Sequence, residues 1–101
     1  MMAPAFHVAQ ETAVWPPPPP LRELLLDADP DERQVADHLA HGELYVARSR
    51  GAAAGAIVIR QTGEDTWEIM NCSVAPEYRR HGCGTALVLH ALHIIRNKGA
   101  R

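Results

Sequence analysis

The chain has 101 residues, of which 47% are apolar and 22% are charged, and its formal net charge is −2. A chain of this length supports one small domain. A charge balance so near neutral gives no reason to expect nucleic acid or an anionic membrane as a partner.

The N-terminus and the cysteines indicate a compartment. The first residues lack the basic and long apolar segments of a signal peptide, and no apolar run reaches the ~18 residues of a membrane span. The two cysteines, Cys72 and Cys83, lie outside a CxxC spacing, which disfavours a disulfide framework and suits a reducing environment. We therefore expect a cytoplasmic protein.

The N-terminal part predicts a weak strand followed by a proline-rich connector. The strand is expected within residues 5–14, around Phe6 and Val8. Trp15 and the five prolines after it favour an exposed polyproline II connector over residues 15–20, inside a single domain that covers residues 1–101. Such a run is also a ligand for SH3- or WW-type domains, but nothing else in the chain indicates signalling, so a stiff linker is favoured.

Two helices are expected next. The segment LRELLLD predicts a short helix over residues 21–27. The sequence Asp29-Pro30-Asp31-Glu32 is typical of a helix start, with an Asx cap, proline at the first helical position and acids in the first turn. This second helix should end at Gly42.

Three strands and a long helix complete the chain. Strands are expected over residues 43–49, 55–61 and 66–74, joined by short turns into an antiparallel meander. Pro76 cannot continue a sheet ladder, so the third of these strands should end near it. The last helix, over residues 84–98, is apolar around much of its circumference. This order of elements predicts an α+β layered domain, a mostly antiparallel sheet flanked by helices.

The strongest functional signal lies in residues 67–96, which predict a strand, a glycine-rich turn and a helix. The first turn of a helix has unpaired N–H groups and a partial charge of roughly +0.5. Glycines before the helix let these groups close around a phosphate without interference from Cβ atoms. An antiparallel meander precedes this element, unlike the parallel βαβ units of nucleotide-binding folds.

Residues 74–87 resemble motif A of the GNAT superfamily, the acyl-CoA N-acyltransferases. The turn of that motif has the pattern Q/R-x-x-G-x-G/A, and here it is Arg79-Arg80-His81-Gly82-Cys83-Gly84. Val74 and Pro76 ahead of the turn, and the aliphatic helix after it, also match the motif. The resemblance implies a GNAT-like mixed sheet and acetyl-CoA as the acyl donor.

The resemblance also implies which groups hold the donor. The Thr85 hydroxyl and the backbone N–H groups of the turn would bind the pyrophosphate; the turn residues are Arg80, His81, Gly82, Cys83 and Gly84. Arg79, Arg80 and His81 would add positive charge nearby. The backbone at Cys72, Ser73 and Val74 would pair with the pantetheine arm and orient the thioester carbonyl.

Glu68 is the candidate general base, because several members of the family have a glutamate at this place on the strand. Strand alternation would put it on the face of Met70, Cys72 and Val74, where burial would raise its pKa and suit it to deprotonate an amine. The alternative is a glutamate that faces solvent or pairs with Arg60. The amine would attack the thioester directly, so both cysteines are expected to be packing and turn residues.

Other polar residues are weaker candidates. Asn71 is either structural or a hydrogen-bond partner of the substrate. The pairs His38–His41 and His90–His93 have the i, i+3 spacing of two metal ligands on a helix, but neither has a third ligand at a recognised spacing. We therefore expect no metal site.

The family's domain normally continues with another strand, a helix and usually two more strands. That part often supplies a tyrosine general acid and one wall of the pantetheine slot, and this sequence lacks the usual C-terminal strands. One edge of the third meander strand is then uncovered, so a homo-oligomer is expected. The leading hypothesis is an N-acetyltransferase that transfers acetyl from acetyl-CoA to a primary amine of a small molecule or protein. The alternatives are a non-catalytic acyl-CoA-binding or regulatory remnant, and a polyproline interaction module.

Overall fold

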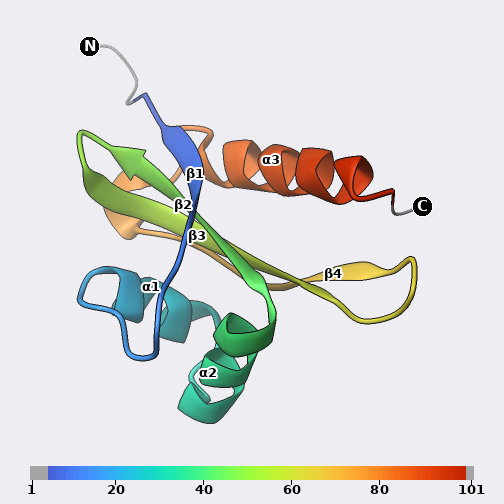
Figure 1. The fold of residues 1–101 in the computed structure, drawn as a ribbon. Coiled ribbons are helices and arrows are strands. Elements are labelled where there is room, and N and C mark those ends of the chain that lie inside the picture. Colours follow the sequence, from blue (N-terminus) through green and yellow to red (C-terminus); the bar gives the residue numbers. More distant parts are fainter. Residues whose placement is uncertain (1–4, 100–101) are drawn as a thin grey trace.

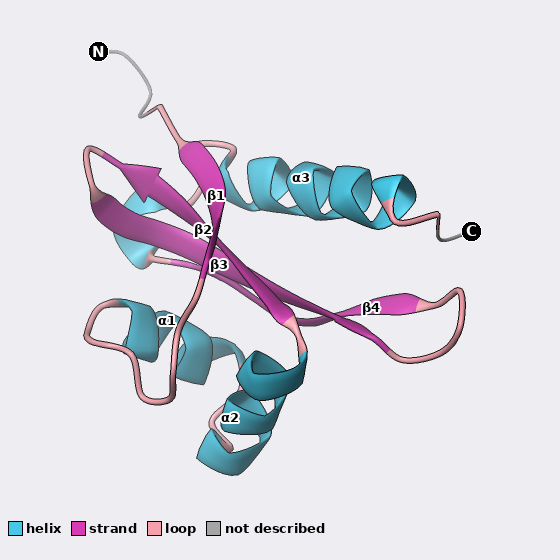
Figure 2. Ribbon diagram, in the orientation of Figure 1, coloured by secondary structure: helices cyan, strands magenta, loops and turns pink. Residues whose placement is uncertain are grey.

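The computed structural model of the chain describes residues 5–99. Its elements are β1 (His7–Glu11), α1 (Leu21–Ala28), α2 (Glu32–His41), β2 (Glu43–Ser49), β3 (Ala52–Gln61), β4 (Trp67–Val74), the short 3₁₀ helix η1 (Pro76–Tyr78) and α3 (Cys83–Asn97). The strands form one antiparallel sheet in the order β1-β2-β3-β4 (Figure 1). Helices α1 and α2 cover one face of the sheet and α3 covers the other (Figure 2). This arrangement confirms the α+β layered fold.

The meander predicted from the sequence is confirmed. β2 has the expected bounds, β4 begins one residue later than expected, and β3 begins at Ala52, three residues earlier than expected. A two-residue turn joins β2 to β3, and both of its residues, Arg50 and Gly51, have positive φ values of 51° and 84°. Turns of this kind match the right-handed twist of the two strands that they connect.

The sheet separates two apolar clusters. On one face of the sheet, Leu25 of α1 packs with Val46 and Val58, and all three are fully or almost fully buried. On the other face, Leu87 of α3 is buried with Ile57. Alternation along β2 and β3 produces both clusters, because successive side chains of a strand point to opposite faces. Burial of each large aliphatic side chain contributes roughly 1.5–3 kcal/mol.

Gly55 on β3 is what allows α3 to approach the sheet closely. A Cβ atom at this position would lie 2.9 Å from the Cys83 sulfur, the Leu87 Cδ1 atom and the Ser73 carbonyl oxygen. Only a residue without a side chain fits between β4 and α3 here. The first turn of α3 is therefore set directly against the centre of the sheet.

The start of α2 differs from the expectation. The capping residue is Asp31, whose carboxylate accepts hydrogen bonds from the N–H groups of Arg33 (3.1 Å) and Gln34 (3.3 Å). Asp29 instead accepts from the Asp31 N–H at 3.0 Å and forms an Asx turn before the helix. Pro30 therefore precedes the cap and is not the first helical residue.

The proline run is exposed as expected at Pro16 and Pro18–Pro20, with one exception. Pro17 is buried, and the run bends at residues 15–16 and turns at residues 19–20. The carbonyl oxygens of Pro18 and Pro20 accept hydrogen bonds from the N–H groups of Arg22 (3.4 Å) and Leu24 (3.1 Å). The run is thus folded into the beginning of α1 rather than extended as a free connector.

Candidate functional site

The N-terminus of α3 is open, because its N-cap residue has no side chain. Gly82 is the N-cap residue with φ +85°, and no side chain within residues 5–99 caps the first turn by accepting a hydrogen bond. Arg80 also has a positive φ, 66°, which is uncommon for a residue with a side chain. Backbone N–H groups that follow such left-handed residues converge into a concavity for anions. The N–H groups of Cys83, Gly84 and Thr85 add the positive end of the helix dipole.

The space in front of this turn is free for a ligand. A Cβ atom built on Gly82 would meet no atom within 4 Å, and Arg80, His81 and Thr85 are exposed. Gly84 lies against β4, with only 3.6 Å between an added Cβ atom and Val74 Cγ2. An open concavity of N–H groups beside cationic side chains fits a phosphate group.

Tyr78 and Arg79 anchor the turn to the rest of the domain. The Tyr78 N–H donates to the Ala75 carbonyl at 2.9 Å, and the Tyr78 ring packs edge-on against Phe6 with ring centroids 6.0 Å apart. Arg79 donates from Nε to the Val74 carbonyl at 3.1 Å and from Nη2 to the Asp27 carboxylate at 3.4 Å. The Arg79 side chain, although exposed, thus joins the turn to β4 and α1.

β4 is the outer strand of the sheet and leads directly into the turn. The Ala75 N–H bonds the Ala54 carbonyl at 2.8 Å. In an antiparallel ladder the hydrogen-bonded pairs alternate, so the peptide groups of Ser73 point to β3 and those of Cys72 and Val74 point away from it. The outward groups are the ones that could bond an extended ligand arm.

Glu68 lies on the face opposite to the expected one. The β3–β4 register shifts between Val58 and Ile59, which leaves Met70 as an extra residue on β4. Glu68 therefore stands across from Arg60, on the face of α1 and α2, and is exposed. The predicted burial beside Cys72 and Val74 is wrong, because the prediction assumed a strand without a bulge.

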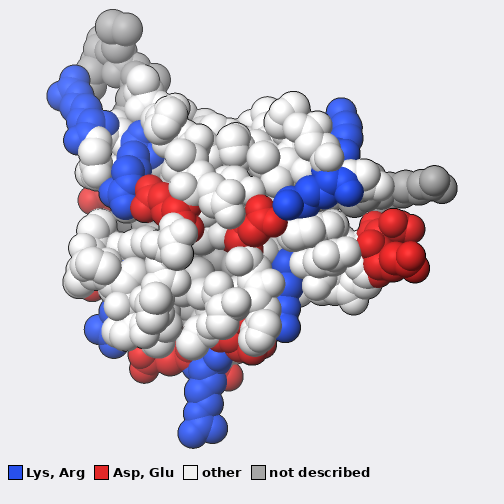
Figure 3. All heavy atoms as spheres, viewed as in Figure 1, with Lys and Arg blue, Asp and Glu red and all other residues white. Residues whose placement is uncertain are grey.

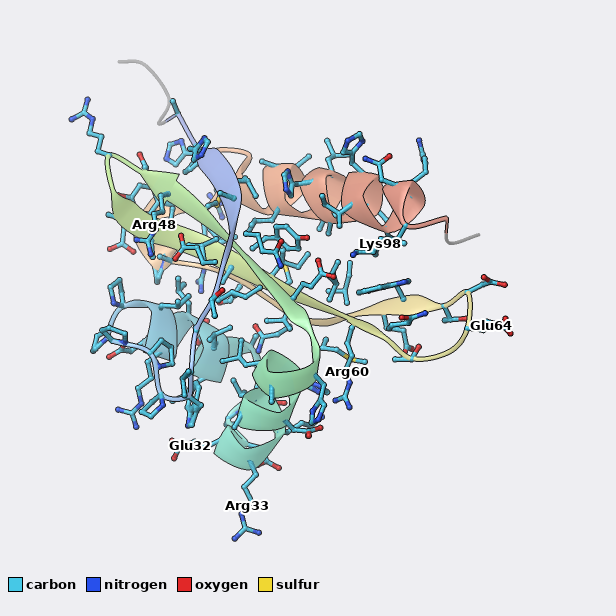
Figure 4. The ribbon with its side chains drawn as sticks, viewed as in Figure 1. Glu32, Arg33, Arg48, Arg60, Glu64 and Lys98 are labelled. Carbon is cyan, nitrogen blue, oxygen red and sulfur yellow. The ribbon has the colours of Figure 1, made fainter. Side chains whose placement is uncertain are left out.

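Arg60 is the charged neighbour of Glu68. Arg60 lies beside α2 (Figure 4). Its Nη1 lies 2.8 Å from an Asp37 carboxylate oxygen and 3.3 Å from His38 Nδ1. This contact holds the pKa of Asp37 below its ordinary value. The guanidinium of Arg60 is thus partly neutralised by α2, and its charge does not act on Glu68 alone.

Asn71, expected to be either structural or a partner of the substrate, has a clear structural contact. It is buried on the α1 face of β4, and its Nδ2 donates to the Leu25 carbonyl at 3.0 Å. Among the described residues its Oδ1 has no hydrogen-bond partner. Asn71 therefore fixes the last turn of α1 to the strand that carries Glu68.

The cysteines and histidines lie where they pack or pair with neighbouring side chains. Burial raises the pKa of both thiols, Cys83 being fully buried and Cys72 lying at the exposed edge, so both remain protonated at neutral pH. His41 Nδ1 lies 3.1 Å from the Asp37 carboxylate, and the His90 ring lies 5.1 Å from that of Tyr45. Within residues 5–99, no three His, Cys, Asp or Glu side chains come together as a metal site would require.

A layered sheet whose edge strand runs into an open, glycine-rich helix N-terminus is the architecture of an acyl-CoA-binding domain. The sequence profile described as "Acetyltransferase (GNAT) family" matches residues 7–101. The chain belongs to the GNAT family of acyl-CoA N-acyltransferases.

Known proteins resemble the chain over most of its length. It is 38% identical over 80 residues to the Uncharacterized N-acetyltransferase YvbK of Bacillus subtilis (strain 168), covering 79% of this chain and 52% of YvbK. A Bacillus subtilis acetyltransferase solved in complex with CoA has a TM-score of 0.87 and 31% identity, over 95% of this chain and 61% of that one. A GNAT family acetyltransferase from Elizabethkingia anophelis with acetyl-CoA bound has a TM-score of 0.84 and 30% identity, with the same coverages. The chain spans about half to three fifths of the length of these relatives.

Proposed function

We propose that this chain transfers an acetyl group from acetyl-CoA to a primary amine of a small molecule or protein. The observation that carries the proposal is the open N-terminus of α3, with Arg80 and Gly82 in left-handed conformations and free space in front of them. The two structural relatives that hold CoA and acetyl-CoA support the choice of donor.

The donor would be held by the turn and by the edge of β4. The pyrophosphate would accept hydrogen bonds from the backbone N–H groups of residues 80–84 and from the Thr85 hydroxyl, beside the charge of Arg80 and the side chain of His81. The outward peptide groups of Cys72 and Val74 would pair with the amides of the pantetheine arm. Arg79 would hold the turn in register with β4 through its bond to the Val74 carbonyl.

Glu68 would act as the general base for the acceptor amine. Bound acetyl-CoA supplies an activated thioester; a C–N bond forms at its carbonyl carbon, the C–S bond breaks and the CoA thiolate leaves. The attacking amine must lose a proton, which the exposed Glu68 carboxylate would take directly or through a water molecule. Both cysteines remain protonated, which favours this direct transfer over an acyl-enzyme route.

The donor site is tested by calorimetric titration of acetyl-CoA into the chain and into two glycine variants. Gly82→Val should abolish binding, because a branched side chain would occupy the concavity and disfavour the left-handed backbone. Gly99→Val is the matched control: Gly99 has φ +81° and equally free surroundings, but at the other end of α3. If Gly82→Val keeps the wild-type affinity, the phosphate site is refuted.

A non-catalytic acyl-CoA-binding remnant is the second candidate. Tyr45 is not available as a general acid, since it is buried and its hydroxyl donates to Glu43 at 2.6 Å. Burial raises the pKa of Tyr45, which further disfavours ionisation. Thiol release from acetyl-CoA over a panel of amines separates the two candidates, because the remnant would bind acetyl-CoA and release no CoA thiol.

We further propose that the protein is cytoplasmic, where acetyl-CoA and free thiols coexist, since Cys72 and Cys83 are unpaired. None of the helices in residues 5–99 combines the length and apolarity needed to cross a bilayer.

A further inference from the structure

Glu68 and Arg60 stand directly opposite each other on β4 and β3. Opposed residues of an antiparallel pair have Cβ atoms roughly 4.5–5.5 Å apart, and opposite charges at such positions attract each other. Within residues 5–99, however, Arg60 forms its ion pair with Asp37 of α2 and not with Glu68. The proposed general base thus has a guanidinium across from it to which it is not paired.

The Arg60 guanidinium is bound to α2 through one nitrogen atom. Arg60 Nη1 donates to Asp37 Oδ2 at 2.8 Å and lies 3.3 Å from His38 Nδ1. A guanidinium has no acceptor, so the contact with His38 is a hydrogen bond only when His38 Nδ1 is unprotonated. Both N–H bonds of Nη1 are then directed to α2, and Arg60 is held at two points.

The Asp37 carboxylate is also fixed on its other side. Asp37 Oδ1 lies 3.1 Å from His41 Nδ1, one turn further along α2. The hydrogen bond from Arg60, and to a lesser extent the charges of Arg60, His41 and His38, hold the pKa of Asp37 below its ordinary value of 3.8. Acidic and basic side chains are both visible over α2 (Figure 3). Asp37 therefore offers Arg60 an ionised partner at a fixed position.

Gly42 sets the end of α2 against the strand that carries Arg60. It is the C-cap residue of α2, and a Cβ atom on it would lie 2.5 Å from the Ile59 carbonyl oxygen and 2.7 Å from the His38 carbonyl oxygen. Only a residue without a side chain permits so close an approach of two backbones. Ile59 precedes Arg60 and His38 follows Asp37, so this contact fixes the spacing between Asp37 and Arg60.

We propose that Asp37 and His38 are positioning residues that hold the Arg60 guanidinium away from Glu68 and so keep the Glu68 carboxylate unpaired. A carboxylate beside a cation is a weaker base, because the cation favours its charged form. Once released from α2, Arg60 would pair with Glu68, which stands opposite to it. An unpaired Glu68 can take the proton of the acceptor amine, a role that rests on the proposed function.

Titration of the Glu68 carboxyl by NMR tests the holding of Arg60 without any substrate. In Asp37→Asn, the midpoint of this titration should fall by about one pH unit relative to wild type, through a new pair with Arg60. Glu32→Gln is the matched control, since it removes one negative charge from an exposed position in the first turn of the same helix. Equal midpoints in the two variants would overturn the proposal.

The Arg60→Gln background separates the release of Arg60 from the lost charge of Asp37. No guanidinium is left there to pair with Glu68, so Asp37→Asn should not lower the midpoint further. A midpoint that Asp37→Asn lowers equally with and without Arg60 would overturn the proposal, because it would report only the missing carboxylate. In the wild-type background, His38→Ala should lower the midpoint less than Asp37→Asn does, and an unchanged midpoint would refute the role of His38.

The rate of thiol release connects the held guanidinium to catalysis. Asp37→Asn should lower the plateau rate roughly threefold to tenfold and move the acid limb of the pH–rate profile to lower pH. The Kd for acetyl-CoA should stay the same, and adding Arg60→Gln should restore both the rate and the profile. A lowered Glu68 midpoint with an unchanged rate would support the holding of Arg60 and refute Glu68 as the general base. If the wild-type chain releases no thiol, the titration alone decides the proposal.

Discussion

The Arg79 guanidinium spans the junction between the outer strand and the site, donating from Nε to the carbonyl oxygen of Val74 at 3.1 Å. Its Nη2 reaches the Asp27 carboxylate of α1 at 3.4 Å. Arg79 therefore connects the end of β4, the turn before α3 and α1. Its position in the motif predicted positive charge near the phosphate; the geometry adds a structural role in fixing where the turn begins.

We expect Arg79→Lys to weaken acetyl-CoA binding about tenfold, although the charge is kept. A lysine ammonium is a point donor and cannot bond the Val74 carbonyl and the Asp27 carboxylate in the way a planar guanidinium does. Arg33→Lys, on an exposed position of α2 far from the turn (Figure 4), is the control and should bind normally. Calorimetric titration measures the affinity of both variants for acetyl-CoA. Equal affinities would argue that the Arg79 contacts with Val74 and Asp27 do not support donor binding.

We expect Gly55→Ala to lower the free energy of unfolding by about 2 kcal/mol, the cost of overpacking a closed site. The added methyl group would lie 2.9 Å from two side-chain atoms and from the Ser73 backbone oxygen, which cannot move aside without breaking the β3–β4 ladder. Gly63→Ala in the exposed hairpin is the control, since its nearest contacts are at an ordinary 3.5 Å. Urea unfolding compares the variants, and a stable Gly55→Ala protein would mean that α3 can shift away from the sheet.

The Glu11–Arg48 pair should make stability depend on pH. Two hydrogen bonds from Arg48 (2.7 and 2.8 Å) hold the pKa of Glu11 below its ordinary value of 4.5. Because the folded-state pKa is the lower one, the pair stabilises the fold above pH 4.5, and this contribution is lost as pH falls through the folded pKa. Glu11→Gln should therefore be less stable than wild type at pH 7.

The difference between Glu11→Gln and wild type should shrink as the pH is lowered towards 3, when the wild-type carboxyl is protonated as well. Urea midpoints measured from pH 7 to pH 3 follow this change. The exposed Glu77 offers a control, because Glu77→Gln should run parallel to wild type. A Glu11→Gln curve that also ran parallel to wild type would show that the pair does not respond to pH.

We expect Glu68→Gln to lower the rate of thiol release roughly a hundredfold, the usual scale for loss of a general base. The Kd for acetyl-CoA should not change, because Glu68 lies on the opposite face of β4 from Val74. Glu64→Gln, four residues earlier at the hairpin end, is the control for charge alone. An unchanged rate of thiol release in Glu68→Gln would show that Glu68 is not the general base.

Much of the fold is predictable from local pattern. The alternation of residues 43–49, the β-branched run of residues 55–61 and the stop at Pro76 define the meander, because a period of two is the signature of a half-buried strand. The glycine spacing likewise predicts the open turn before α3. These features depend on residues close together in the chain.

The errors involve choices that distant contacts decide. Asp29 and Asp31 are both good caps, and only the backbone at Asp31 brings its carboxylate to the free N–H groups of α2. Pro17 is buried because the run folds against the domain, which no local pattern reveals. The face of the sheet on which Glu68 lies depends on which residue of β4 is the extra one at the bulge. Ile69 and Met70 are both apolar, so the sequence does not distinguish the bulged residue from the one that pairs with Ile59.

Met70, the extra residue at the bulge, reverses the alternation of side chains along β4. On the turn side of Met70 the strand shows its even-numbered residues to α3, and on the hairpin side it shows its odd-numbered ones. Removal of Met70 would restore one uninterrupted alternation along β4. The side chains of residues 67–69 would then point to the opposite faces of the sheet. Glu68 would then face α3, and Trp67 and Ile69 would face α1 and α2, so a deletion of one codon would move the carboxylate to the other side of the sheet while leaving the turn before α3 untouched.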